Sequence, residues 1–301
     1  MISGQFTAKI LSYLESSGRT LNQALLDEAG KRVQQAFRRQ LMEEREDAPG
    51  VLRMSAGGQC VRKQWYGFKG APREALGART INTFLMGDIC EVGLSILGRL
   101  AGWQLTGKPD GEDLLLLDLP RVLHRGEPPD EPYKITGHLD DLLYVLEEER
   151  YYVVEYKSMS EYSFREFEKN GLNDFWGYAT QLELYSLAMD APGKILVGMC
   201  KNTGHLHDVV VGRAASLATR ALERWDVILN RDEMPEREFD AVPETTYNRK
   251  TKERDPTGRT ILDVRCSYCP FRATCWPDAK MELKGEKPLW VVSEAQTRMD
   301  V

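Results

Sequence analysis

Apolar residues recur at helical spacing through the first part of the chain. Between residues 5 and 45 they return every three or four positions, as at Phe6, Ile10 and Leu14, which predicts a helical N-terminal region. The charged run EEREDA and Pro49-Gly50 end it, and residues 55–70 are expected to form a loop with a short aromatic helix. Residues 80–102 predict one long helix that ends at a glycine.

From residue 114 onward the period changes to that of strands. Residues 114–119, 133–146 and 150–158 predict three strands, and the turn EEER joins the last two as an antiparallel hairpin. The segment 160–175 is polar. The pattern further predicts a helix over 176–190, a strand pair over 194–200 and 207–212, and a helix over 214–230. This order predicts an α/β fold with a mixed central β-sheet flanked by helices.

The same pattern divides the chain into three parts. Residues 1–54 form the helical N-terminal region, residues 55–232 form the core, and residues 233–301 form a tail rich in proline and charge. Neither an internal repeat nor a low-complexity tract interrupts this order.

Composition narrows the class of protein. The apolar runs are short, and the start lacks the basic and apolar regions of a secretory signal, so we expect a soluble cytoplasmic protein without a membrane partner. The formal net charge of −6 gives no hint of a nucleic-acid partner and does not exclude one. Six cysteines in a reducing compartment favour metal binding or core packing over disulfides. The four histidines form no HExxH pair, which argues against histidine-based zinc hydrolysis.

The stretch VVEYKS carries the first candidate chemistry. Glu155 and Lys157 project from the same face of the predicted strand, which taken alone is common on half-exposed strands. The hairpin brings Asp140 beside Glu155, and two neighbouring carboxylates repel unless a cation lies between them. Mg²⁺ or Mn²⁺ prefers such oxygen ligands, and Lys157 can then orient or activate water and stabilise charge on a phosphate. These are the parts that phosphodiester hydrolysis needs.

The spacing of Asp140 and Glu155-x-Lys157 resembles that of the PD-(D/E)xK nuclease superfamily, and the flanking features resemble its RecB-like exonuclease branch. The resemblance implies a restriction-endonuclease-like core and a DNA substrate. It also implies that Asp140, Glu155 and Lys157 are catalytic, that Asp140 and Glu155 are metal ligands, and that Tyr156 offers its backbone carbonyl to the metal. The family pattern selects Asp140 over Asp141, whose side chain is expected on the opposite face.

Two helical motifs extend the resemblance. The branch carries a G-x-x-x-H motif before the sheet, and here Glu91 of MGDICE stands where the family often has the metal-binding histidine. After the third strand the branch has a Q-x-x-x-Y motif, which Gln181 and Tyr185 match on one helical face. The resemblance implies that Glu91 binds metal and that Gln181 and Tyr185 contact DNA.

Cysteines mark a second candidate site. The stretch CSYCPFRATC places three thiols within ten residues: Cys266, Cys269 and Cys275. Tetrahedral ligation needs a fourth thiol. Cys60 lies in a loop rich in glycine and charge, whereas Cys90 and Cys200 lie in apolar segments and are better explained as core thiols.

One early cysteine with a late C-x2-C-P-F-R-x-x-C resembles the iron-sulfur subset of these nucleases, which includes CRISPR-associated exonucleases, AddB and phage relatives. This implies a structural 4Fe-4S cluster that packs the C-terminal tail onto the core through Cys60. By analogy with a disulfide, closing so long a loop is worth about 5 kcal/mol. Structural Zn²⁺ is the alternative, although zinc ribbons usually carry two C-x2-C pairs.

Cations and aromatic rings flank these cysteines and are candidates for DNA contacts. They are Arg62, Lys63, Trp65 and Tyr66 after Cys60, and Arg265, Arg272 and Trp276 around the late cysteines.

The resulting hypothesis is a metal-dependent DNA exonuclease acting on single strands or duplex ends in recombination, repair or phage DNA metabolism, in a bacterial cell or phage-infected host. One alternative is a nuclease that processes spacer precursors with CRISPR adaptation proteins. Another is a DNA-binding or assembly module that retains the nuclease fold without catalysis.

Overall fold

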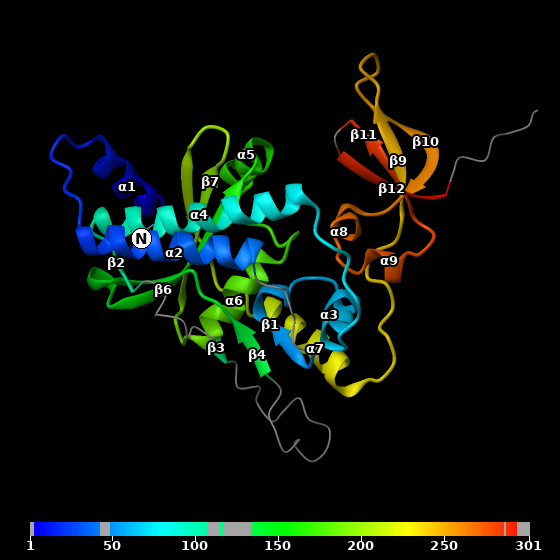
Figure 1. The fold of residues 1–301 in the computed structure, drawn as a ribbon, viewed down its shortest axis with the longest axis horizontal. Helices are drawn as coiled ribbons and strands as arrows, with labels where there is room; N and C mark the ends of the chain where they lie inside the picture. The colour runs from blue at the N-terminus through cyan, green and yellow to red at the C-terminus, as the bar shows by residue number, and fades with distance from the viewer. Residues whose placement is uncertain (1–2, 43–48, 107–114, 117–133, 286, 294–301) are drawn as a thin grey trace, which may run out of the picture.

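The structure is a computed structural model that describes residues 3–42, 49–106, 115–116, 134–285 and 287–293. Its centre is a five-stranded sheet in the order β2-β5-β6-β7-β8 (Figure 1). The strands are β2 (Gln104–Leu105), β5 (Asp141–Val145), β6 (Arg150–Met159), β7 (Gly193–Cys200) and β8 (Leu206–Val210). Strands β6 and β7 run parallel and the other neighbours run antiparallel, which confirms the predicted mixed sheet.

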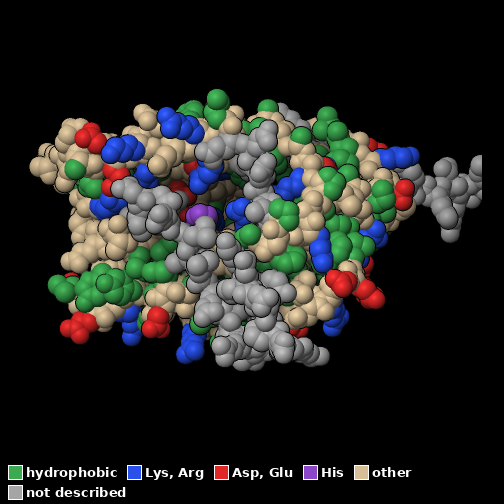
Figure 2. Space-filling view, turned by 60° about the horizontal axis from the view of Figure 1, so that its bottom comes forward, with side chains coloured by type: hydrophobic (Ala, Val, Ile, Leu, Met, Phe, Trp, Pro, Cys, Tyr) green, Lys and Arg blue, Asp and Glu red, His purple; other side chains and the backbone are tan. Residues whose placement is uncertain are grey.

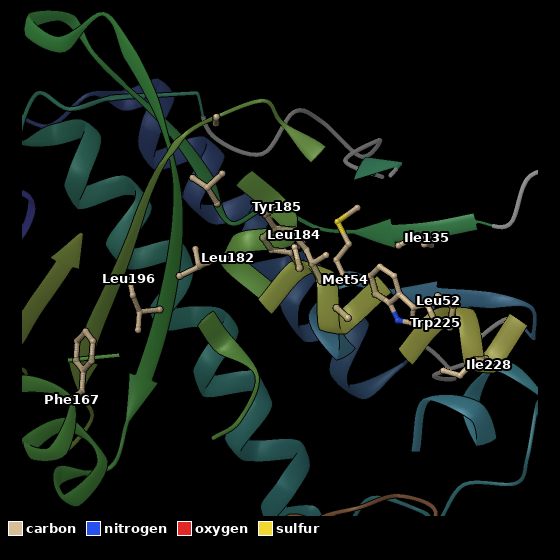
Figure 3. Close-up of a cluster of buried hydrophobic side chains, with 14 residues drawn as sticks. Leu52, Met54, Ile135, Phe167, Leu182, Leu184, Tyr185, Leu196, Trp225 and Ile228 are labelled. Atoms are coloured by element: carbon tan, nitrogen blue, oxygen red, sulfur yellow. The ribbon is translucent and has the colours of Figure 1, made fainter. Parts of the chain in front are cut away.

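Helices cover both faces of this sheet, because alternate residues of its strands are apolar on both sides. On one face Val154 and Tyr156 pack with Phe6 and Leu94, from α1 (Gln5–Glu15) and α4 (Ala78–Leu100). Helix α2 (Gln23–Leu41) lies on the outer side of α4. On the other face Val153 packs with α6 (Tyr178–Ala188), and α7 (Ala215–Asn230) packs on α6 (Figure 3).

Helix α4 is long and apolar enough to span a membrane by length and composition alone, a test that core helices of soluble proteins also pass. Here it packs between α2 and the central sheet, and its Ser95 is fully buried.

The predicted strand 133–146 is wrong in one respect, since the structure breaks it in two. Strand β4 (Lys134–Gly137) pairs with β1 (Val51–Arg53) and β3 (Leu115–Leu116) in a separate three-stranded sheet, and only β5 joins the central sheet. Gly137 ends β4 where a Cβ atom would come within 2.6 Å of the Tyr185 ring. The rest of the predicted strand 114–119 lies outside the described residues.

Two further segments contain structure that the sequence pattern did not predict. The polar segment 160–175 holds helix α5 (Glu161–Asn170), which Ser160 caps and which buries two phenylalanines. The C-terminal tail forms a four-stranded antiparallel sheet in the order β11-β12-β10-β9. The strands of this sheet are β9 (Val242–Tyr247), β10 (Arg254–Ile261), β11 (Lys280–Lys284) and β12 (Lys287–Ser293). The tail also contains the short helices α8 (Val264–Ser267) and α9 (Arg272–Cys275). Helix α3 (Val61–Phe68) is the short helix expected within residues 55–70.

A buried carboxylate holds the C-terminal sheet together. Glu244 of β9 accepts hydrogen bonds from Lys284 at 2.6 Å, from Arg259 at 2.8 Å and from Thr257 at 2.9 Å. The hydrogen bond from Lys284, with those from Arg259 and Thr257, lowers the pKa of Glu244 to about 2. This sheet therefore relies on a charged hydrogen-bond network where its strands supply few buried apolar side chains.

A second buried carboxylate attaches the N-terminal helix to the edge of the central sheet. Asp208 of β8 accepts hydrogen bonds from Gly4 N at 2.8 Å, Thr7 N at 2.9 Å and Thr7 Oγ1 at 2.6 Å. It thus supplies from a distant strand the capping group that α1 lacks in its own sequence, and its charge complements the helix dipole.

Replacing this cap tests its contribution to stability. Asp208→Ala leaves the buried donors of Thr7 without an acceptor and should lower the free energy of unfolding by about 2 kcal/mol. Urea unfolding followed by circular dichroism measures the change, with the exposed Asp278→Ala as the control. Equal stability of the two variants would contradict the capping role.

Candidate functional site

Strand β6 places Glu155 and Lys157 on the face that α6 covers, and Tyr156 on the face that α1 and α4 cover. The Tyr156 ring lies 6.3 Å from the Phe6 ring in the apolar layer. Glu155 is only 1% exposed, although it carries a carboxylate. The alternation that the sequence predicted therefore holds at this strand.

Glu155 has one satisfied and one unsatisfied oxygen. Its Oε1 accepts a hydrogen bond from Gln181 Nε2 at 2.7 Å and forms an ion pair with Lys157. Its Oε2 is buried and has no hydrogen-bond partner among the described residues. Burial raises the pKa of Glu155, the Lys157 charge opposes this rise, and the Glu91 charge adds to it. An unsatisfied buried oxygen of this kind is costly unless another group binds it.

Asp140 lies just before β5, beside the end of the β5–β6 pairing. Its Oδ2 accepts a hydrogen bond from Tyr156 N at 2.9 Å, and the residue is buried. Burial alone would lower the pKa of the half-buried Lys157, but the charges of Glu155 and Asp140 outweigh it and raise that pKa. Lys157 is therefore a protonated cation across the physiological pH range.

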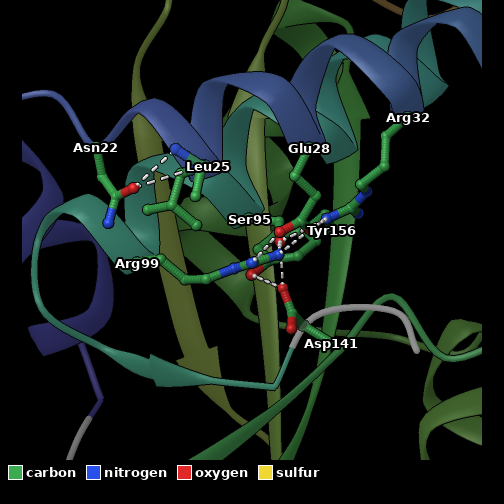
Figure 4. Close-up of polar contacts among 9 residues, drawn as sticks. Asn22, Leu25, Glu28, Arg32, Ser95, Arg99, Asp141 and Tyr156 are labelled. Atoms are coloured by element: carbon green, nitrogen blue, oxygen red, sulfur yellow. Dashed lines mark hydrogen bonds and ion pairs between the residues drawn. The ribbon is translucent and has the colours of Figure 1, made fainter. Parts of the chain in front are cut away.

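The neighbouring Asp141 belongs to a different network, shown in Figure 4. Its Oδ2 accepts hydrogen bonds from Ser95 Oγ at 2.6 Å and from the Tyr156 hydroxyl at 3.2 Å. Ser95 Oγ in turn accepts one from Arg32 at 3.0 Å. Asp141 thus ties β5 to α4 and α2, while Asp140 contacts the backbone of β6.

Glu91 approaches the same region from α4. Its Oε1 lies 3.8 Å from the buried Arg32, and its negative charge contributes to the raised pKa of Glu155. The structure therefore brings Glu91, Asp140 and Glu155 into one electrostatic neighbourhood.

Gln181 and Tyr185 lie on one face of α6, beneath Glu155. Gln181 Nε2 donates to Glu155 and lies 3.3 Å from the Tyr185 hydroxyl. Both side chains are buried, and burial raises the pKa of Tyr185. Their described contacts orient Glu155. His138, two residues before Asp140, is exposed.

The donor chemistry of the carboxylates suits a hard divalent cation. Among the described residues, no group of three or more His, Cys, Asp or Glu side chains is already spaced to hold one metal ion. The buried Glu155 Oε2 without a partner is nevertheless an atom that a cation would satisfy. Glu91, Asp140, Glu155 and the Tyr156 carbonyl are the oxygen donors that fit Mg²⁺ or Mn²⁺.

The four predicted cysteines meet in one cavity of about 220 Å³. Cys60 enters it from the start of α3, Cys266 from α8, Cys269 from the segment between α8 and α9, and Cys275 from the end of α9. Burial and the charges of the other three thiolates raise the pKa of Cys266 to about 12. Cys90 and Cys200 do not line this cavity.

Cations accompany these thiols. Arg62 Nη1 lies 3.7 Å from Cys275 Sγ, and Lys63 is close enough to Cys269 and Cys60 for their charges to act on it. Burial lowers the pKa of Lys63. A cavity lined by four thiols and four cationic side chains suits a positively charged group that converts the thiols to thiolates, because the cations offset the negative charge of the resulting complex.

Other contacts join the C-terminal segment to the core beside this cavity. Glu74 forms an ion pair with Arg272 and accepts a hydrogen bond from Ala273 N at 2.7 Å. The Tyr66 and Phe271 rings lie 5.5 Å apart. The cavity is therefore a joint between segments that are distant in sequence.

Sequence reasoning missed a buried ion pair that fixes α6. Lys194 begins β7 and is 1% exposed, and its ammonium pairs with Glu183. Glu183 also accepts a hydrogen bond from Ala214 N at 3.2 Å. A lysine at the start of an apolar strand gives little local signal, because its partner lies on another element.

Comparison with known proteins adds the family. A family model described as the PD-(D/E)XK nuclease superfamily matches residues 14–276. No curated protein matches this chain.

The chain is similar, at low identity, to three solved structures. SSO0001 has a TM-score of 0.47 at 15% identity, over 82% of this chain and 95% of that one. LHK-Exo in complex with dAMP has a TM-score of 0.42 at 11% identity, over 65% and 91%. The alkaline exonuclease LHK-Exo from Laribacter hongkongensis has a TM-score of 0.41 at 13% identity, over 65% and 91%.

The buried ion pair can be tested without touching the candidate site. Glu183→Ala leaves the Lys194 charge buried and unpaired and should lower the free energy of unfolding by about 3 to 5 kcal/mol. The double variant Glu183→Leu/Lys194→Met removes both charges and should lie within about 1 kcal/mol of the wild type. Urea unfolding measures both. A double variant as unstable as the single one would refute the ion-pair explanation.

Proposed function

The chain belongs to the PD-(D/E)XK nuclease superfamily, and on that premise we propose that it is a metal-dependent DNA exonuclease acting on single strands or duplex ends. The observation that carries this proposal is the buried carboxylate of Glu155, with Lys157 on one oxygen and no described partner on the other. A purely structural strand gains nothing from such an arrangement, because an unsatisfied buried oxygen destabilises the fold.

The residues that would hold Mg²⁺ or Mn²⁺ are Glu91, Asp140, Glu155 and Tyr156, the last through its backbone carbonyl. When bound, such a cation supplies Lewis-acid polarisation of a phosphoryl oxygen and a more acidic bound water. Gln181 keeps one oxygen of Glu155 fixed, so that the other remains oriented for binding. The hydrogen bond from Tyr156 N fixes Asp140 in the same way.

Lys157 supplies a fixed positive charge in this proposal. Its ammonium pairs with Glu155 and can donate hydrogen bonds to a phosphate oxygen or to the attacking water. A cation held beside two carboxylates stabilises the negative charge that develops on phosphate oxygens. Figure 2 adds that Lys and Arg side chains gather around a hollow on one face of the molecule, which suits a polyanionic substrate.

For the cysteine cavity, we propose a structural 4Fe-4S cluster on Cys60, Cys266, Cys269 and Cys275. All four cysteines line one cavity, and their single C-x2-C pair differs from the two pairs usual in zinc ribbons, which favours the cluster over zinc. Arg62 and Lys63 would offset the negative charge of the four thiolates.

Replacing the charged residues tests the catalytic proposal. Asp140→Ala and Lys157→Ala should each lower Mg²⁺- or Mn²⁺-dependent digestion of end-labelled single-stranded DNA by at least about 100-fold. Lys157→Arg should retain part of the activity, because it keeps the charge. The exposed Lys169→Ala is the control, and chelator should abolish all digestion. Full activity of Asp140→Ala and Lys157→Ala would refute the assignment.

Removing one cysteine tests the cluster. The anaerobically purified wild type should be brown and contain iron and sulfide, and Cys266→Ser should lose the visible absorbance and unfold at a lower temperature. Cys90→Ser, outside the cavity, should keep both properties. A colourless wild type that contains stoichiometric zinc would show that the four cysteines bind zinc and not an iron-sulfur cluster.

A further inference from the structure

Three large aromatic side chains lie exposed between the candidate active site and the cysteine cavity. Phe175, Trp176 and Tyr268 are 44%, 40% and 64% exposed, and we call them the aromatic platform. The Phe175 and Trp176 ring centroids are 5.0 Å apart, and those of Trp176 and Tyr268 are 6.5 Å apart. All three also line the mouth of the cysteine cavity.

The loop that carries Trp176 leads directly to a contact with the catalytic strand. Tyr178 follows Trp176 by two residues, and the ammonium of Lys157 lies 5.1 Å from the Tyr178 ring centroid. The segment that presents Trp176 therefore also contacts the cation beside the candidate carboxylates.

Hydrogen bonds and close backbone packing hold the loop that carries Phe175 and Trp176. Asp174 Oδ1 accepts from Thr180 N at 2.9 Å, and its Oδ2 accepts from Thr180 Oγ1 at 2.6 Å. Gly177, with a φ of 84°, packs against the backbone of Gly58, where a Cβ would lie 3.1 Å from two backbone atoms. Rings presented on a preorganised loop lose little conformational entropy when a ligand stacks on them.

A cation supports the outer end of the platform. The Arg265 guanidinium lies 4.8 Å from the Phe175 ring centroid, and Asp263 fixes its orientation through hydrogen bonds of 2.8 and 2.9 Å. The same guanidinium lies 3.7 Å from the Phe239 ring centroid, so it braces Phe175 against a second ring and places a positive charge beside the platform.

We propose that the aromatic platform stacks the unpaired bases of single-stranded DNA whose backbone leads to Lys157. The proposal rests on the nuclease function above and names the form of its substrate. Paired bases in a duplex have their faces covered, so exposed rings select unpaired bases. The neighbouring cations favour nucleic acid over a protein partner for this surface.

This placement differs from the aromatic contacts expected from sequence. Tyr66 is only 6% exposed, and Trp65 and Trp276 are half-buried with their indole N–H groups inside the protein. Tyr66 and Trp276 line the cavity and Trp65 packs against the hydrophobic core, so the stacking role is assigned to the more exposed platform.

Binding to bases can be separated from binding to phosphates. With divalent cations removed by chelator, fluorescence anisotropy compares a short oligothymidylate with an abasic strand of equal length. Trp176→Ala and Tyr268→Ala should weaken oligothymidylate binding by about 5- to 100-fold and leave the abasic strand unaffected. Tyr247→Ala, an equally exposed tyrosine on β9, is the control and should bind as the wild type does.

Three results would overturn the proposal. The first is unchanged oligothymidylate binding by both platform variants. The second is loss of the visible absorbance in Trp176→Ala, which would make the ring a cover for the cavity. The third is equal wild-type binding of both strands, which would show that unpaired bases contribute nothing to binding.

Cleavage is measured separately on the same proteins, so the two proposals can fail independently. If Lys157→Ala still digests DNA while Trp176→Ala loses base-dependent binding, the platform stands and the catalytic assignment fails. If Lys157→Ala is inactive while Trp176→Ala binds as the wild type does, the reverse holds.

Discussion

The burial of a charged carboxylate on the central strand constrains the rest of the site. Taking Glu155 out of water costs several kcal/mol, and the protein offsets part of this with Lys157 on its own strand and Gln181 on α6. The Gln181 contact ties α6 to β6. The nearby pair of Lys194 and Glu183 holds the same helix to β7, so the site and the core share their supports.

Two adjacent aspartates at the start of β5 make different contacts. Asp140 contacts the β6 backbone beside Glu155, whereas Asp141 joins a network that reaches Arg32 on α2 through Ser95. The N-terminal helices are thus linked by hydrogen bonds to the strand that carries the candidate ligands. A change in the packing of the N-terminal helices would be transmitted to the site through Asp141, which is not a candidate ligand.

Local periodicity was enough to predict much of the fold. Alternation identified β6 and its hairpin with β5, and helical spacing placed Gln181 and Tyr185 on one face. The break at residues 138–140 was not predictable, because it depends on the close approach of Tyr185 to Gly137, which is a tertiary contact. The small C-terminal sheet was missed because its residues are mostly polar and its stability comes from long-range charged contacts to Glu244.

The candidate residues, like the fold, could be predicted only as far as local spacing determines them. The carboxylates and cysteines were identifiable from their spacing, but their surroundings were not. Sequence placed the aromatic contacts near Trp65, whereas solvent exposure belongs to Trp176, whose loop is held by Asp174 and Thr180. Exposure is decided by packing between distant segments, and spacing alone does not report it.

The cysteine cavity also sets an order of events during synthesis. Cys60 emerges from the ribosome early, and its partners follow only when residue 275 has been made, about 10 to 40 s later at ordinary rates of translation. Every strand of the central sheet lies between these two points. The carboxylate strand can therefore pair before the cavity exists, and closing the cavity is a later step that must wait for residue 275.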